Sequence, residues 1–143
     1  MRVNEMYLKL NYNSGEFLSE KEVVLQIPKD VKLWSIEAGL SNIPGKLIPF
    51  STTHPKDGFR DKDPKTIFNQ DNRFAGTIDS AWIDYTRWPQ IRAKIDITDP
   101  EVKFLIRQEK VLISYAYWRY LSPAASFSFD VDHLLIYPRK GGA

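Results

Sequence analysis

The feature that most constrains this chain is an alternation of apolar and polar residues with a period of two. Because neighbouring side chains of a β-strand point to opposite faces, this period is typical of strands with one buried face. The clearest example is residues 91–97, where apolar residues at the odd positions alternate with Arg92, Lys94 and Asp96. Further strands are predicted over residues 6–12, 23–27, 127–131 and 134–137.

The segment from Val111 to Tyr120 has a different pattern, since apolar and aromatic residues occupy both alternations. Such a run is typical of a strand that is covered on both sides. After the first predicted strand, Asn13-Ser14-Gly15 has the composition of a turn. Several short strands in one chain favour a barrel or a strongly curved sheet.

Two helix starts interrupt the strands. Asp99 and Pro100 supply an N-cap and a first-turn proline, and apolar residues follow at helical spacing up to Lys110. Asp63-Pro64 repeats this signal before a shorter helix predicted over residues 65–70. The fold class is therefore mainly β with a few helices (α+β).

Length and composition limit the number of domains and the classes of partner and chemistry that the chain can have. The 143 residues suit one domain, 1–143, with a loose tail at 140–143. The net charge of +2 is too small to indicate a nucleic-acid partner, and no apolar stretch indicates secretion or a membrane. Without cysteine, thiolate chemistry and Cys-ligated zinc are excluded. No ligand spacing indicates a metal, and no cofactor is expected.

The chain contains only two histidines, His54 and His133. His54 precedes Pro55, which favours an extended backbone, and lies in a Pro-, Lys- and Asp-rich surface excursion over residues 51–72. His133 enters the last predicted strand. Histidine is the usual base at neutral pH, although a single histidine is more often an ordinary surface or core residue.

Ser114 is the one aliphatic hydroxyl in a run from Val111 to Trp118 whose other residues are apolar or aromatic. A buried hydroxyl needs a hydrogen-bond partner, so Ser114 either bonds a neighbouring carbonyl or is a nucleophile whose proton a histidine accepts. Asp132 is adjacent to His133, but neighbouring strand residues point to opposite faces. Asp132 is therefore expected to be a poor partner for that ring, and a second histidine would have to orient the first.

Five segments occur in an order that is similar to one protein family. They are His54-Pro55, Gly76-Thr77-Ile78, Ile97-Thr98-Asp99-Pro100-Glu101, Ile113-Ser114-Tyr115-Ala116-Tyr117 and Asp132-His133-Leu134-Leu135-Ile136-Tyr137-Pro138-Arg139-Lys140-Gly141-Gly142. This order resembles the phage prohead (capsid maturation) proteases of the herpesvirus-assemblin type. The resemblance runs from residue 54 to the C-terminus, and the first fifty residues carry none of its motifs.

The resemblance implies an assemblin-like closed or strongly curved β-barrel flanked by helices. It also implies a Ser-His-His triad with Ser114 as nucleophile. We assign His54 as the base and His133 as the orienting residue, although the sequence leaves these two parts interchangeable. Arg139 and Lys140 fall where the family places its oxyanion segment.

The activity that the resemblance implies is a serine endopeptidase acting in viral prohead maturation. Its substrates would be scaffold and major capsid proteins, inside the procapsid or in the host cytoplasm, and it would act as a homodimer. The terminal Gly142-Ala143 would suit either self-processing or a truncated chain.

Two departures from the family pattern keep a second hypothesis open, a catalytically inactive barrel that serves as a structural capsid component. Ala116 replaces a usual glycine, and Lys140-Gly141 replaces a Gly-Arg pair. A third hypothesis is a binder of single-stranded nucleic acid, with aromatic residues interleaved with arginines as a stacking surface. Those residues are Trp82, Trp88, Tyr115, Tyr117, Trp118 and Tyr120, with Arg87, Arg92 and Arg119. Core positions and solvated strand faces explain the same pattern more simply.

Overall fold

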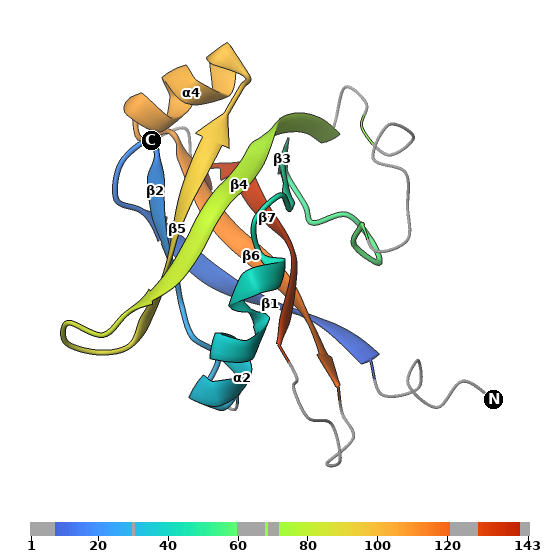
Figure 1. Cartoon of the computed structure of the whole chain (residues 1–143). Coiled ribbons are helices and arrows are strands. Elements are labelled where there is room, and N and C mark those ends of the chain that lie inside the picture. The colour runs from blue at the N-terminus through green and yellow to red at the C-terminus, as the bar shows by residue number, and fades with distance from the viewer. Residues whose placement is uncertain (1–7, 30, 60–67, 69–71, 121–128, 141–143) are drawn as a thin grey trace.

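The structure is a computed structural model that describes residues 8–29, 31–59, 68, 72–120 and 129–140. Over these residues seven strands close into a barrel in the order β1-β2-β5-β4-β3-β7-β6, and β6 pairs back onto β1 (Figure 1). The strands are β1 (Leu8–Phe17), β2 (Glu22–Leu25), β3 (Leu47–Ser51), β4 (Asn72–Asp84), β5 (Gln90–Ile97), β6 (Val111–Tyr120) and β7 (Asp130–Pro138). The predicted mainly β fold with a few helices is confirmed.

The alternation of apolar and polar residues correctly predicted strand β5. Ile91, Ala93, Ile95 and Ile97 are all buried in the barrel core, whereas the polar residues between them are not. The predicted bounds of β6 are also confirmed, with Ile113 and Tyr115 fully inside the core. Burial of such alternating apolar faces is the main force that closes the sheet.

The turn predicted at Asn13-Ser14-Gly15 is wrong, because these residues continue β1. Ser14 pairs with Ser114 of β6, and the next residue, Gly15, pairs with Leu25 of β2. β1 therefore passes from one neighbouring strand to the other at this point. Pairing with β6 up to Ser14 and with β2 from Gly15 bonds backbone groups that a turn would leave open, and this outweighs the local turn preference.

The two strands predicted over 127–131 and 134–137 are one strand, β7, for the part that the structure describes. β7 contains a β-bulge: His133 pairs with Ala116 and Val131 pairs with Tyr117, so Asp132 has no partner of its own. Val131 and Leu134 both lie in the core. The two residues between them therefore both face outward, as a bulge allows.

Two α-helices flank the barrel, and Figure 1 shows them toward opposite ends of it. α4 (Pro100–Arg107) confirms the predicted helix, and Asp99 caps it by accepting hydrogen bonds from the N–H groups of Glu101 and Val102. α2 (Leu33–Gly39) and the 3₁₀ turn η1 (Leu40–Asn42) were not predicted, because α2 has only seven residues and no side-chain cap.

Both helices bury apolar side chains in the barrel core, Ile36 from α2 and Val102 and Ile106 from α4. The helix predicted at 65–70 lies outside the described residues apart from Phe68, as do residues 141–143 of the predicted tail. None of the helices in the described ranges has the length and apolar character needed to cross a membrane.

Candidate active site

Ser114 lies in the middle of β6, on the outer face of the barrel. Its neighbours Ile113 and Tyr115 point into the core, so the alternation of the strand turns the Ser114 side chain outward, where it is half-buried. Because β6 pairs with both β1 and β7, the backbone that carries this hydroxyl is held on both sides.

His54 follows β3 by three residues and reaches Ser114 of β6 across β7, which lies between β3 and β6. β3 runs parallel to β7, with Phe50 opposite Ile136, and this register brings the end of β3 close to β7 and its partner β6. The Nε2 atom of His54 is 2.6 Å from the Oγ atom of Ser114. The ring of Tyr12 on β1 lies against the His54 ring, with centroids 4.5 Å apart.

The environment of His54 favours its neutral form. Burial, and secondly the neighbouring His133, lower the pKa of His54 from 6.5 to about 4, although the charge of Asp132 acts in the opposite direction. At neutral pH the ring therefore has one nitrogen free to accept a proton. That is the state a general base requires.

His133 lies behind His54 and is completely buried. Its Nε2 atom is 2.8 Å from Nδ1 of His54. The ring of Phe59 packs edge-on against it with centroids 5.2 Å apart, and Ala116 is directly across from it on β6. The structure thus brings together all three side chains that the sequence singled out, in the order Ser114, His54, His133.

Asp132 corrects one expectation from the sequence. Its Oδ1 atom is 2.6 Å from Nδ1 of His133, so the aspartate does contact the ring that it was expected to miss. The expectation assumed a regular strand, whereas the bulge in β7 places Asp132 and His133 on the same face. The hydrogen-bonded chain consequently has four members, from Ser114 through both imidazoles to a carboxylate.

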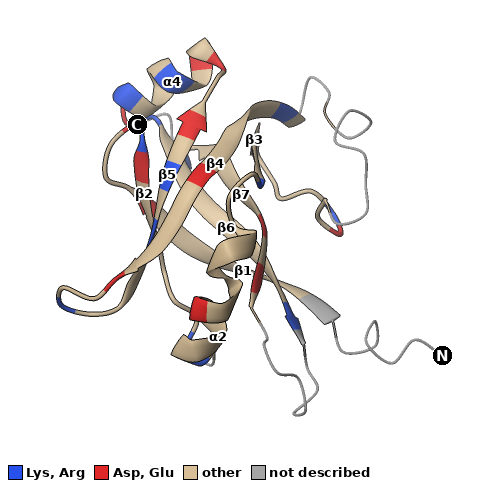
Figure 2. Cartoon of the chain, viewed as in Figure 1, with Lys and Arg blue, Asp and Glu red and all other residues tan. Residues whose placement is uncertain are grey.

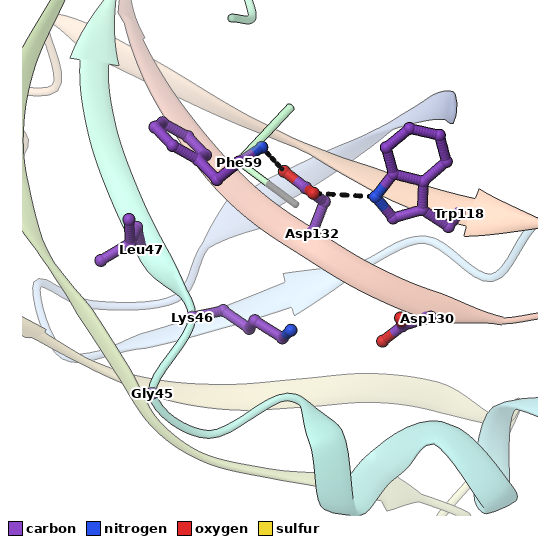
Figure 3. Close-up of a pocket in the computed structure, with 7 residues that line it drawn as sticks. All are labelled: Gly45, Lys46, Leu47, Phe59, Trp118, Asp130 and Asp132. Carbon is purple, nitrogen blue, oxygen red and sulfur yellow. Dashed lines mark hydrogen bonds between the residues drawn. The ribbon is translucent and has the colours of Figure 1, made fainter. Parts of the chain in front are cut away.

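The carboxylate of Asp132 is buried and has two more partners (Figure 3). The backbone N–H of Phe59 donates to Oδ1 over 2.9 Å, and the indole N–H of Trp118 donates to Oδ2 over 2.8 Å. Burial raises the pKa of Asp132, but the hydrogen bonds from His133, Trp118 and Phe59 outweigh it and hold the pKa below its usual range. The group is therefore an anion at neutral pH.

Arg139 and Lys140 are not brought to Ser114. The backbone N–H of Arg139 donates to the carbonyl of Lys110 over 2.9 Å, and its guanidinium Nε donates to the backbone carbonyl of Glu109. Lys110 precedes Ser114 by four residues, which is a span of roughly 13 Å along an extended chain. In this structure the expected oxyanion segment is at the far end of β7 and its N–H is already bonded.

The aromatic residues considered as a stacking surface do not form one face. Tyr115 and Tyr117 are in the core, and the indole N–H of Trp118 is bonded to Asp132. Arg92 forms ion pairs with Glu22 and Asp84. Figure 2 shows basic and acidic residues close together on α4 and β5, rather than one basic face.

Sequence reasoning missed Asp132, Phe59 and Trp118 as parts of the site. One signal was present for Asp132: Phe129 and Val131 are apolar at odd positions, whereas Leu134 and Ile136 are apolar at even positions. A change of parity within one strand indicates an inserted residue. Phe59 takes part through its backbone N–H, for which side-chain patterns carry no signal.

The arrangement can support nucleophilic attack by Ser114, with His54 as the acceptor of its proton. Among the side chains that the structure describes, no group of three or more His, Asp or Glu residues is placed to hold a metal ion. Comparison with protein-family models, with curated proteins and with solved structures finds no match to this chain.

Proposed function

We propose that the protein is a serine endopeptidase that cleaves scaffold and major capsid proteins during prohead maturation, with Ser114, His54 and His133 as its triad. The observation that carries this proposal is the unbroken contact from the Ser114 hydroxyl through His54 to His133. The three residues come from segments far apart in the chain. A chance meeting of the only two histidines of the sequence with the one serine of an apolar and aromatic run is a weak explanation for such contacts.

In the acylation step the Ser114 Oγ attacks the carbonyl carbon of the scissile peptide bond. Its proton moves to Nε2 of His54, and a C–O bond forms. The tetrahedral intermediate then breaks its C–N bond, and the protonated His54 gives the proton to the leaving amine. Water repeats the sequence on the acyl-enzyme: His54 accepts a proton from the water, and Ser114 leaves with its proton restored.

His133 orients His54 in this scheme. With 2.8 Å between Nδ1 of His54 and Nε2 of His133, the Nδ1–H of His54 can be held while Nε2 faces the serine. The structural contacts thereby favour His54 as base and His133 as the orienting residue, a choice that the sequence left open. The motif order supports the prohead setting, with action inside the procapsid and in a homodimer following from the same resemblance.

A fluorophosphonate serine probe tests the nucleophile without knowledge of the substrate. The wild-type protein should be labelled at Ser114, identified by peptide mass spectrometry, and Ser114→Ala should abolish the label. Ser80→Ala is the matched control, because Ser80 is also a half-buried strand serine but lies on β4. Cleavage of a co-expressed scaffold protein should disappear in Ser114→Ala alone. Labelling that persists in Ser114→Ala would contradict the proposal.

The second candidate is an inactive barrel with a structural role in the capsid. One observation favours it: the N–H of Arg139, expected to stabilise the oxyanion, is bonded to Lys110 instead. Removal of one oxyanion donor costs about 10²–10³-fold in kcat where this has been measured in other enzymes. A folded wild-type protein that resists the probe would favour this candidate over the peptidase.

A further inference from the structure

We propose that Asp132 is a positioning residue, a fourth member of the site that fixes the direction of every hydrogen bond between itself and Ser114. The inference rests on the proposed role of Ser114 as nucleophile for its catalytic consequence. Its structural content, the orientation of protons along the chain, stands independently of any activity.

Both oxygens of the Asp132 carboxylate accept hydrogen bonds. A backbone N–H and an indole N–H can only donate, and these groups of Phe59 and Trp118 occupy Oδ1 and Oδ2 respectively. Donors on both oxygens stabilise the ionised carboxylate, whose oxygens carry no proton to donate. Asp132 is therefore held as an anion that can only accept.

The Asp132 anion determines which nitrogen of each imidazole carries the proton. Since Oδ1 of Asp132 accepts, Nδ1 of His133 must donate, and a neutral His133 then has its lone pair on Nε2. Nδ1 of His54 lies 2.8 Å from that lone pair and must donate to it. The lone pair of His54 is consequently on Nε2, 2.6 Å from the Ser114 hydroxyl. The Asp132 carboxylate thus directs the lone pair of His54 toward the Ser114 hydroxyl.

Without an anion, the protons of His54 and His133 could also be placed the other way round. Two neutral imidazoles in contact can equally hold their protons in the opposite direction, with His133 donating through Nε2 and His54 donating from its own Nε2 toward Ser114. In that state His54 has no lone pair for the serine proton. An anion beside Nδ1 of His133 excludes this state, and it also stabilises the positive charge that forms on the pair during attack.

Asp132 also holds the loop that carries His54. The backbone at Gly58 has φ +66, and a Cβ atom there would lie 2.6 Å from Oδ1 of Asp132. With the Phe59 N–H bonded to the same oxygen, the backbone at Gly58 and Phe59 lies directly against the carboxylate. Figure 3 shows this contact together with the Trp118 bond on the other side of Asp132. The same residue therefore sets both the proton direction and the place of the loop.

The test is Asp132→Asn, measured by ¹⁵N NMR of the histidine side chains and by the rate of fluorophosphonate labelling. Because the chain has two histidines, only four ring nitrogens contribute to the spectrum. In the wild-type protein both rings should carry their proton on Nδ1. An amide presents a donor at one of the positions where the carboxylate has an acceptor, so the variant should show inverted or mixed histidine tautomers. Its labelling should be about 10²-fold slower. In serine proteases whose aspartate bonds the base directly, replacement of that aspartate lowers kcat by about 10⁴-fold.

Asp130→Asn is the matched control, since Asp130 precedes Asp132 by two residues on β7, and both line one pocket with Phe59 and Trp118 (Figure 3). It should leave the tautomers and the labelling rate unchanged. If Asp132→Asn does not fold, Trp118→Phe is the second test, because it removes one donor to Asp132 and keeps the aromatic packing. It should change the tautomers and the labelling rate in the same direction, by a smaller amount. Wild-type tautomers in a folded Asp132→Asn protein would overturn the inference. Shifted tautomers in a protein that the probe never labels would uphold it and remove the proposed peptidase instead.

Discussion

At the scale of single residues, the neutral imidazole of His54 decides whether the site can work. A base must be unprotonated before attack and protonated after it, so its free form has to dominate at the working pH. Burial and the second imidazole shift His54 toward the neutral form, whereas the Asp132 carboxylate, one ring further away, compensates part of that shift. The charge of the aspartate therefore leaves His54 a stronger base than burial and His133 alone would make it.

The pKa of His54 predicts an unusual pH dependence. A base with a pKa lowered to about 4 stays neutral as pH falls below 6.5, so probe labelling of Ser114 should hold its rate down to pH 5 and decline near pH 4. Labelling rates measured from pH 4 to 8, with circular dichroism at each pH to confirm folding, would check this. A decline centred at pH 6.5 would show that His54 is not held in its neutral form.

The same residues make the fold sensitive to acid. Because the folded pKa of His54 is below its unfolded value, the unfolded state binds more protons between about pH 4 and 6.5, and stability falls as pH is lowered through that range. The lowered pKa of Asp132 acts in the same direction, since its stabilising form is the anion and is lost on acidification. The labelling rates are therefore compared only at pH values where the protein remains folded.

At the scale of elements, the site depends on one bulge and one loop. The bulge in β7 rotates Asp132 and His133 onto the same face, and the loop after β3 brings His54 over them. A turn in that loop, with the N–H of Gly58 donating to the carbonyl of Pro55, directs Phe59 back toward β7. Neither feature forms part of a regular ladder, which agrees with the general tendency of bulges to lie beside active sites.

A pair of glycines tests whether the loop must contact Asp132. Gly58 and Gly45 both have positive φ, +66 and +88, but an added Cβ would meet Asp132 at Gly58 and open space at Gly45. Gly45→Ala should lower stability by about 1 kcal/mol through backbone strain alone, and Gly58→Ala by more, because its Cβ also meets Asp132. Only Gly58→Ala should also slow labelling of Ser114, by about tenfold or more. Equal labelling rates for the two variants would show that the contact with Asp132 is not needed.

The elements that the sequence predicted correctly share a strong local signal. β5 has four alternating apolar residues, and α4 has an aspartate cap followed by proline, so each could be located without tertiary information. The bulge in β7 and the path of β1 between two partners depend on which strands become neighbours. Local patterns do not contain that information, and the rejection of Asp132 followed directly from treating β7 as regular.

At the scale of the whole molecule, closure of the barrel assembles the site. Ser114 is on β6, His133 and Asp132 are on β7, and His54 follows β3, so the order β3-β7-β6 places the three sources side by side. The residues in contact are 60 and 79 positions apart in the chain. Ser114, His54 and His133 were recognisable from the sequence, whereas the part of Asp132 and the convergence of all four side chains depended on pairing between distant strands.

This dependence predicts that the site and the barrel unfold together. Because the four linked residues lie on β6, on β7 and in the loop bonded to β7, no part of the site should survive loss of the sheet. In a urea titration, the histidine ¹⁵N signals that report the ordered tautomers should disappear at the same midpoint as the sheet signal in circular dichroism. Gly58→Ala supplies the contrast, since loosening the loop from Asp132 should move the histidine transition to lower urea than the sheet transition. Separate midpoints in the wild-type protein would mean that the loop opens on its own, and His54 would then be a mobile base that the barrel does not hold in place.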